Sequence, residues 1–244
     1  MAQLGGQACR PGVQKQLFVV LDEACRQLLL VHDMEARDAT SKVWISVAQR
    51  IQAIAQTGLT YATNPYDVER YTELSGIAAS MIAGPEPESI ALAKRFFASD
   101  HGYATPKVDV RAAVFQNDRL LLVRELEDGC WTLPGGWAEV GQSAAESVER
   151  EVREESGYIV KAVKLMACWD RNKHPHPSIP YHAYKLVFRC ELLGGAPNRN
   201  RETTGVDFFA EDHIPMLSVT RTLPEQIRFV FQSLRDPAAP TAFD

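Results

Sequence analysis

Three glutamates that could bind a cation, Glu151, Glu154 and Glu155, stand within a stretch of five residues. On a helix, which turns by about 100° per residue, the three carboxylates share one face. Like charges at this spacing repel one another, so their grouping suggests that a positive charge lies between them. Carboxylate oxygens are hard ligands that suit Mg²⁺ or Mn²⁺. The sequence therefore predicts a divalent-cation site on a helix.

The helix itself is predicted by the residues at its two ends. Ser143 with Glu146 three residues later forms a capping box, and Gly157 can adopt the positive φ that ends a helix. The expected helix spans 144–156, about three and a half turns.

Arg150 and a pair of glycines complete the predicted site. Arg150 precedes Glu151 and lies one turn before Glu154, where its fork of donors can hold a carboxylate in one orientation. Gly135 and Gly136 let the backbone approach a metal or a phosphate without a Cβ in the way. The competing interpretation is that these residues form only a solvated, charged helix face. Under it, the cap, the glycines, the arginine and the three glutamates would occur at these positions by chance.

The segment 133–158 resembles the signature of the Nudix hydrolases, which is Gly, five residues, Glu, seven residues, then Arg-Glu-apolar-x-Glu-Glu-x-Gly-apolar. The residues that match in register are Gly136, Arg150, Glu151, Val152, Glu154, Glu155 and Gly157, with Tyr158 at the closing apolar position. The departure is Gln142, where the family usually has Glu. Gln keeps an oxygen there, so we expect activity to survive the change.

This resemblance implies metal-dependent hydrolysis of a pyrophosphate. The implied metal ligands are Glu151, Glu154, Glu155 and the carbonyl of Gly136. Arg150 would orient Glu151, and Glu154 is our first choice for the base that takes a proton from the attacking water. Glu202, in the loop before an expected strand at 206–209, is a further catalytic candidate; its alternative interpretation is a solvated loop residue.

A longer likeness, carried by segments 54–61, 66–71, 105–111 and 169–177, is to one Nudix subgroup with a helical N-terminal module. That subgroup is commonly described as acting on X-linked nucleoside diphosphates, including ADP-ribose and CDP-choline. It implies a homodimer formed with the help of the helical module, and a contribution of that module to the substrate pocket.

The pattern of apolar residues changes near residue 100, which predicts two domains. Residues 14–100 carry apolar side chains at helical spacing and are expected to form the helical domain, for dimerisation and substrate support. Residues 101–244 contain short strand-like runs and two helices, and the resemblance implies an α+β Nudix domain, an α/β/α sandwich with a mixed sheet. Residues 1–13 are expected to be disordered.

Local signals define the expected elements. Strands are expected at 108–114, 120–123, 163–169, 184–190 and 206–209, and a last helix at 224–234, which would close the domain. Residues 116–118 are expected to form a hairpin turn. Asp67 is expected to cap a helix that runs to about Ala83, where the Gly-Pro-Glu-Pro at 84–87 forces a break.

Five residues outside the acidic helix are candidate substrate-binding residues. They are Arg111, Asp170, Arg171, His174 and His176. The two histidines alternate with prolines in a loop that could cover the pocket. A zinc site with His182 as the third donor and a plain exposed loop are the alternatives. Arg111 could reach a phosphate or form a surface ion pair.

The amino-acid composition indicates which classes of partner and which cellular compartment to expect. The 26 Lys and Arg against 31 Asp and Glu give a net charge of −5 and a pI near 5.7, which makes nucleic acid an unlikely partner. No apolar run is long enough to cross a bilayer, so no membrane partner is expected. The five cysteines are odd in number and contain no CxxC pair, which disfavours a disulfide framework and favours the reducing cytoplasm.

The expected function is a Mg²⁺- or Mn²⁺-dependent pyrophosphohydrolase that cleaves a nucleoside diphosphate linked to a small group X. Its products would be a nucleoside monophosphate and phosphorylated X, with ADP-ribose and CDP-choline types as leading substrates. One alternative is a non-catalytic nucleotide sensor on the same fold, to which Gln142 is the only pointer. The other is an RNA 5′-end pyrophosphohydrolase, which the absence of a basic track disfavours.

Overall fold

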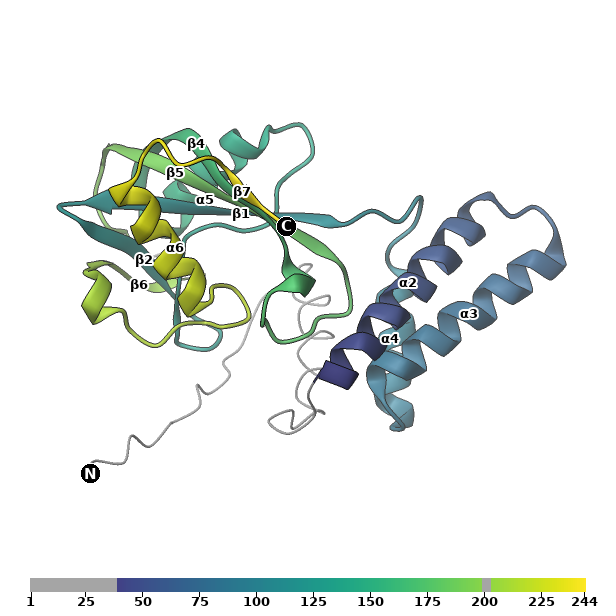
Figure 1. Ribbon diagram of the computed structural model, residues 1–244. Helices are drawn as coiled ribbons and strands as arrows, with labels where there is room; N and C mark the ends of the chain where they lie inside the picture. Colours follow the sequence, from purple (N-terminus) through teal and green to yellow (C-terminus); the bar gives the residue numbers. More distant parts are fainter. Residues whose placement is uncertain (1–38, 199–202) are drawn as a thin grey trace, which may run out of the picture. The chain divides into compact units, whose positions relative to one another are not determined.

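The computed structural model describes residues 39–198 and 203–244, which form two compact units (Figure 1). The described part of the first unit is 39–107 with 178–182, and that of the second is 108–177 with 183–198 and 203–244. The boundary lies seven residues beyond the predicted one because the segment before it is bonded to the helices. Ala104 N–H donates to Thr57 Oγ1 at 3.2 Å, and Gln56 Nε2 donates to the Gly102 carbonyl at 3.3 Å. The expected disordered segment 1–13 lies outside the described residues.

The first unit contains three helices: α2 (Ala39–Tyr61), α3 (Pro65–Ala83) and α4 (Pro87–Ala98). Small side chains dominate where they meet, so the helix backbones can approach closely. The buried core consists of Ala48, Ala78, Ala79, Ile82, Ala83, Ala93, Phe96 and Phe97. The helical character predicted for this region is confirmed over these residues.

The ends of α3 confirm one boundary prediction and correct another. Asn64, not Asp67, is the N-cap: its side chain accepts a hydrogen bond from Tyr66 N–H at 2.9 Å. Asp67 lies in the first turn and pairs with Arg70 at 2.7 Å. Asn64 takes the cap because Pro65 follows it, and proline is suited to the first helical position. The predicted break is confirmed at Gly84, which follows the helix with φ of 75°.

The second unit is built on a mixed sheet. Its strands are β1 (Lys107–Gln116), β2 (Arg119–Glu125), β3 (Trp131–Thr132), β4 (Tyr158–Asp170), β5 (Ala183–Gly195), β6 (Thr203–Phe209) and β7 (Ala242–Phe243). Their order is β3-β2-β1-β5-β4-β7, and β6 pairs with β2. β4 runs antiparallel to β5 and parallel to β7. The expected hairpin turn is confirmed, with positive φ at Asn117 and Asp118.

Several strands differ from the prediction. The short β3 was not predicted, β5 ends five residues after the expected strand, and β6 begins three residues before it. β4 begins five residues before the expected strand, because three register shifts against β5 break the alternation of apolar and polar residues that identifies a strand. β7 follows the last helix, so that helix does not close the domain. Two residues carry too little pattern for sequence reasoning to detect such a strand.

Two helices cover opposite faces of the sheet, α5 (Ala144–Ser156) on one and α6 (Pro224–Arg235) on the other (Figure 1). On the α5 face the buried core includes Val110, Ala112, Val114, Leu121, Val148 and Val152. On the α6 face it includes Ala113, Leu120, Leu122, Ile227, Val230 and Phe231. Successive residues of β1 and β2 thus point to alternate layers, and the predicted α+β sandwich is confirmed.

The described residues also bear on compartment. None of their helices combines the length and the apolar character that crossing a membrane demands. Cys168 and Cys190 are free thiols. The reducing cytoplasm stays a prediction.

Candidate active site

Helix α5 carries the predicted acidic residues, and its ends are those that the sequence predicts. Ser143 Oγ accepts a hydrogen bond from Glu146 N–H at 3.2 Å, and the Glu146 carboxylate accepts one from Ser143 N–H at 2.8 Å. Gly157 ends the helix with φ of 80°. The helix start and end are therefore fixed by local contacts.

Arg150 holds two of the three predicted carboxylates. Its Nη2 lies 2.8 Å from Glu151 Oε1, and its Nη1 lies 2.6 Å from Glu154 Oε2. Its Nε donates to Gln142 Oε1 at 3.2 Å, an acceptor that the amide supplies as a carboxylate would. Burial raises the pKa of Glu151, and Arg150 opposes that shift. Part of the positive charge expected between the glutamates is therefore Arg150 itself.

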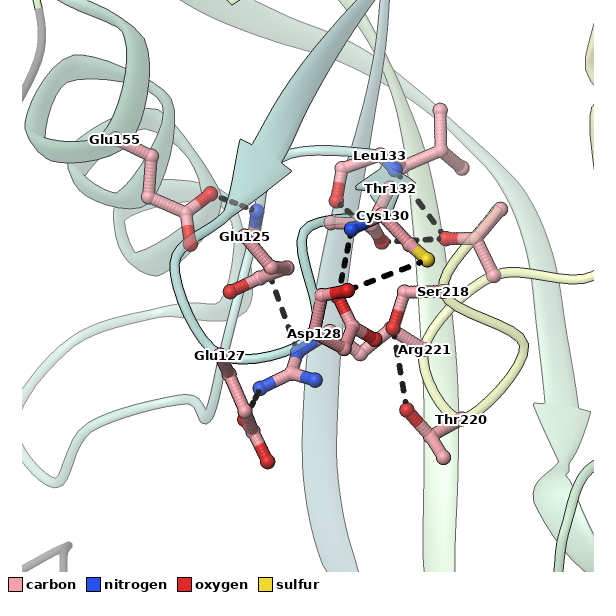
Figure 2. Close-up of polar contacts among 12 residues, drawn as sticks. Glu125, Glu127, Asp128, Cys130, Thr132, Leu133, Glu155, Ser218, Thr220 and Arg221 are labelled. Atoms are coloured by element: carbon pink, nitrogen blue, oxygen red, sulfur yellow. Dashed lines mark hydrogen bonds and ion pairs between the residues drawn. The ribbon is translucent and has the colours of Figure 1, made fainter. Parts of the chain in front are cut away.

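Glu155 lies on the buried side of α5 and contacts the loop that contains the two glycines. Its Oε2 accepts a hydrogen bond from Gly135 N–H at 2.7 Å (Figure 2). Burial, and then the neighbouring carboxylate of Glu125, raise its pKa well above the usual range. An uncompensated charge in this position is costly, so a cation close to Glu155 would be strongly stabilised.

Glu125 and Arg221 belong to this site, although the sequence did not indicate them. Glu125 ends β2, is buried, and lies 3.1 Å from Arg221 Nε; burial raises its pKa. Arg221 also lies 2.6 Å from Glu127 (Figure 2). The signal in the sequence is a glutamate two residues after the apolar run at 120–123. That signal is weak because most such glutamates are exposed.

The glycine loop, residues 133–136, lies directly against β1. Val110 N–H donates to the Gly136 carbonyl at 2.8 Å, and Ala112 N–H donates to the Pro134 carbonyl at 2.9 Å. Gly135 has φ of 141°, and a Cβ there would lie 2.0 Å from the Val110 carbonyl oxygen. Only glycine fits at this point, because the loop lies against the backbone of β1. The approach of the two glycines to a metal or a phosphate stays a prediction.

Gly136 faces Glu151. A Cβ on Gly136 would lie 3.1 Å from the Glu151 carboxylate, so the Gly136 backbone lies against the Glu151 side chain. The Gly136 carbonyl, predicted as a metal ligand, already accepts the Val110 N–H. A carbonyl oxygen has a second lone pair, so this bond leaves it one further contact.

The donors around α5 suit a hard divalent cation, since they are carboxylate and carbonyl oxygens. The raised pKa values of Glu151 and Glu155 indicate carboxylates that lack full compensation. Across the described residues, however, no three or more His, Cys, Asp or Glu side chains are arranged to hold a metal ion. The side chains near α5 are therefore of the types that bind a divalent cation. Which of them bind it stays a prediction.

Arg111 is buried beside the acidic cluster and not on the surface. Its Nε donates to Asp109 Oδ1 at 2.9 Å, and its Nη1 donates to the Leu133 carbonyl at 3.1 Å. Its charge opposes the burial-driven rise in the pKa of Glu151 and of Glu155. The alternative of a surface ion pair is wrong, because the pair that Arg111 forms is buried.

The other predicted substrate-binding residues lie around the short helix η1 (Arg171–Lys173). Asp170 Oδ1 caps this helix by accepting Asn172 N–H at 2.9 Å. Arg171 is buried and donates to the Thr220 carbonyl at 3.2 Å. The His174 ring lies against Trp169, with centroids 5.3 Å apart. Asp170 and His174 are partly exposed, but His174 Nε2 is buried and lies 3.3 Å from Asp244 Oδ1.

His176 corrects the sequence interpretation, because it is a buried structural residue. Gln226 Oε1 accepts Leu223 N–H at 3.0 Å, so its Nε2 is the donor to His176 Nε2 at 3.1 Å. His176 Nδ1 must then carry the proton and donate to the Val219 carbonyl at 2.8 Å. Both ring nitrogens are engaged within the protein, and neither can contact a phosphate.

Two further candidates receive no structural support. Glu202 lies outside the described residues, so its role stays a prediction. The zinc alternative at His174, His176 and His182 is not supported either, since the described chain has no such metal-binding group.

Comparison with known proteins identifies the class to which this fold and acidic helix belong. Residues 105–230, more than half of the chain, match the NUDIX domain. The chain therefore belongs to the Nudix hydrolase family and is an enzyme of that family. Residues 42–97 match Nudix_N, the UDP-X-like N-terminal oligomerisation domain. This second match places the chain in the subgroup with a helical N-terminal domain.

Individual relatives agree with this assignment. A putative ADP-ribose pyrophosphatase of Bacillus subtilis (strain 168) is 44% identical over 201 residues, which cover 82% of this chain and 97% of the relative. The crystal structure of a UDP-X diphosphatase is 34% identical, with a TM-score of 0.54, and covers 84% of this chain and 99% of its own. An ADP-ribose pyrophosphatase from Streptococcus suis is 41% identical, with a TM-score of 0.53, and covers 57% and 100%.

Proposed function

We propose that this Nudix hydrolase cleaves the pyrophosphate of a nucleoside diphosphate linked to a small group X, with Mg²⁺ or Mn²⁺ bound at α5. The products are a nucleoside monophosphate and phosphorylated X. One observation carries the proposal: the buried Glu155 carboxylate accepts the Gly135 N–H, and Glu155 lies one turn after Glu151 and next to Glu154, both of which Arg150 contacts. Glu155 thus lies beside a loop whose backbone can approach a phosphate, on the helix that also carries Glu151 and Glu154.

The carboxylates of Glu151, Glu154 and Glu155, with the Gly136 carbonyl, would hold the cation. When bound, the cation neutralises phosphate oxygens and lowers the pKa of water. Within the chain, Arg150 orients the carboxylates of Glu151 and Glu154. The exposed fractions of these two side chains are 13% and 56%, so Glu154 is the one that can meet an attacking water and take its proton.

The substrate class is proposed from the relatives and from the likeness in sequence. Two relatives are named for ADP-ribose, and the UDP-X diphosphatase and the N-terminal match refer to UDP-X. CDP-choline enters from the sequence likeness alone. ADP-ribose is therefore our leading substrate, UDP-linked compounds come next, and Asp170 and His174 are the proposed substrate contacts.

We also propose that α2 forms a homodimer with a second copy of the chain, as the oligomerisation domain at 42–97 suggests. Exposed apolar side chains on this helix are Val43, Trp44, Val47, Ile54 and Tyr61. Three of them recur every seven residues, or two turns, which aligns them on one face. Light scattering is expected to give a dimer for the native chain and a monomer for Val47→Lys/Ile54→Lys. We place this dimer in the cytoplasm.

A nucleotide panel with and without each metal tests the proposed activity. ADP-ribose, UDP-glucose and CDP-choline are incubated with Mg²⁺ or Mn²⁺, and released monoester is measured after phosphatase treatment. Glu154→Gln is expected to lower turnover about 100-fold or more while the chain still binds the nucleotide. Glu146→Gln, the same change on the same helix, keeps the capping contact and is the matched control. No turnover of any compound by the metal-loaded native chain would refute the proposal.

The sensor alternative makes a different prediction in the same assay, because a sensor would bind nucleotide with no turnover to lose. An RNA 5′-end activity would favour a triphosphorylated oligonucleotide over ADP-ribose. The retained carboxylates on α5 argue against the sensor, and the net charge of −5 argues against the RNA 5′-end activity.

A further inference from the structure

A network of three buried charged side chains lies next to the proposed active site. Asp109 and Arg111 come from β1, and Lys185 comes from β5. The exposed fractions of the three side chains are 8%, 8% and 2%. Arg111 Nε donates to Asp109 Oδ1 at 2.9 Å, and Lys185 Nζ donates to Asp109 Oδ2. Asp109 therefore uses both carboxylate oxygens to hold two cations away from water.

Arg111 connects this network to the glycine loop. Its Nη1 donates to the Leu133 carbonyl at 3.1 Å, and two residues later Gly135 N–H donates to Glu155 at 2.7 Å. The guanidinium is thus held between Asp109 and the start of the loop. Since the planar fork of arginine fixes both bonds together, a shift of Arg111 would displace the loop.

Stability alone gives little reason for this network. Removing charges from water is costly, and a buried pair can often be replaced by apolar side chains without loss of stability. Alternate residues of a strand share a face, and those beside the network on β1 and β5 are the buried Ala113, Ala183 and Val187, against which an apolar replacement would pack. The charge of the buried Arg171 also acts on Lys185. A role in the site explains why charged residues stand there instead.

We propose that Asp109 and Lys185 are positioning residues that act through Arg111. By fixing the guanidinium, they hold the glycine loop so that Gly135 N–H meets the Glu155 carboxylate in the geometry that hydrolysis needs. This inference rests on the proposed pyrophosphohydrolase function. It concerns the position of the loop, so it can also be tested without turnover.

The double variant Asp109→Val/Lys185→Met tests the inference. It removes one buried negative and one buried positive charge, leaves Arg111 its charge, and takes away the anchor of Arg111. The melting temperature of this variant is expected to fall, because Arg111 stays buried without Asp109, but the variant is expected to remain folded at the assay temperature. Its kcat is expected to fall about 10-fold or more, with KM changed less than about threefold. A native kcat, or a kcat loss matched by a loss of folded protein, would overturn the inference.

A matched control is Glu149→Gln/Lys161→Met, which removes another ion pair of the same unit, 3.1 Å long, between α5 and β4. The glutamine introduced there can still accept the Ala162 N–H that the Glu149 carboxylate accepts. This control is expected to keep native kcat and native melting temperature. A kcat loss of equal size in the control would show that any missing ion pair has this effect, and would overturn the inference.

Hydrogen exchange gives the readout that does not depend on turnover. Backbone exchange over residues 131–138 is expected to increase in the Asp109→Val/Lys185→Met variant and to stay native elsewhere in the second unit. Unchanged exchange in this segment would overturn the inference even if the native chain proved inactive on every nucleotide. If the double variant does not fold, Arg111→Lys replaces it with the same expectations, because lysine keeps the charge but cannot bridge Asp109 and Leu133.

Discussion

Gly135 N–H donates a 2.7 Å hydrogen bond to Oε2 of Glu155, which joins the glycine loop to the last turn of α5. The carboxylate that accepts this bond is buried next to the carboxylate of Glu125. This hydrogen bond therefore joins the glycine loop, which could approach a phosphate, to the Glu155 carboxylate, which a bound cation would stabilise. The proposed activity requires a charged Glu155 to bind the cation, whereas the stability of the metal-free chain favours an uncharged side chain at this position.

Glu155→Gln is expected to separate these two demands. The amide keeps an oxygen for Gly135 N–H, but it removes the cost of a buried charge next to Glu125. Folding raises the pKa of Glu155, so the stability it contributes is full at low pH and is lost as pH rises through the folded-state pKa. The variant is thus expected to be more stable than the native chain at pH 8, and equal to it in stability at pH 4.

Urea unfolding at both pH values measures this difference. Turnover is expected to fall about 100-fold or more in the same variant, because a cation ligand is lost. A variant that is less stable than the native chain at pH 8 would show that the charge of Glu155 is compensated in the absence of metal.

A pair of glycine variants tests the close approach of the loop to β1. Gly135→Ala would place a Cβ 2.0 Å from the Val110 carbonyl oxygen, so the loop must move away from both β1 and Glu155. Gly141→Ala is the control, since Gly141 also has positive φ but has no atom within 4 Å of the added Cβ. The control is expected to lose about 1 kcal/mol of stability and keep its activity. Gly135→Ala is expected to lose more stability and about 100-fold in kcat. Equal activity in the two variants would contradict the importance of the loop position.

The part of the site that the sequence predicted is the part set by local spacing. The capping box of α5 joins residues three apart, and Arg150 contacts residues one and four positions later. Helical geometry places residues three and four apart side by side, which accounts for the cap and for the Arg150–Glu154 contact. The contact with Glu151 was implied by the Nudix signature. For these reasons the bounds of α5 and the contacts of Arg150 could be predicted without a fold.

The residues that sequence reasoning missed reach the site from distant segments. Arg221 meets Glu125 from a loop almost a hundred residues later, and Lys185 meets Asp109 across the pairing of separate strands. No period in the sequence relates such positions. The prediction for His176 was wrong because it relied on local spacing alone. The spacing of His174 and His176 suggested a shared role, but tertiary packing buries His176 and leaves His174 partly exposed.

Gln142 offers a direct test of the residue at which the chain departs from the Nudix signature. Its Oε1 accepts hydrogen bonds from Arg150 Nε at 3.2 Å and from Ser147 Oγ at 3.1 Å. Gln142→Glu keeps an acceptor there, so kcat is expected to change less than about threefold. Gln142→Leu removes the acceptor and frees Arg150, which is expected to lower kcat about 10-fold. A large gain in kcat for Gln142→Glu would instead indicate that the native chain is impaired at this position.

His176 is expected to control stability at acid pH and not the reaction. Burial first, and then the charges of Arg171 and Lys185, lower its pKa to about 3. Between pH 6.5 and 3 the unfolded chain binds a proton at His176 that the folded chain does not, so stability falls as pH falls. At pH 5 the loss from this group is about 2 kcal/mol.

His176→Asn removes the titration and retains an N–H that can donate to the Val219 carbonyl. The variant is expected to be less stable than the native chain at pH 7, because the contact with Gln226 is lost, but to lose less stability between pH 7 and pH 5. Its kcat at pH 7.5 is expected to stay within about twofold of the native value, since neither ring nitrogen reaches the substrate. Denaturant unfolding across this pH range measures the difference in slope. A parallel pH dependence in the two proteins would mean that another buried group causes the acid sensitivity, and a large loss of kcat would return His176 to the list of substrate contacts.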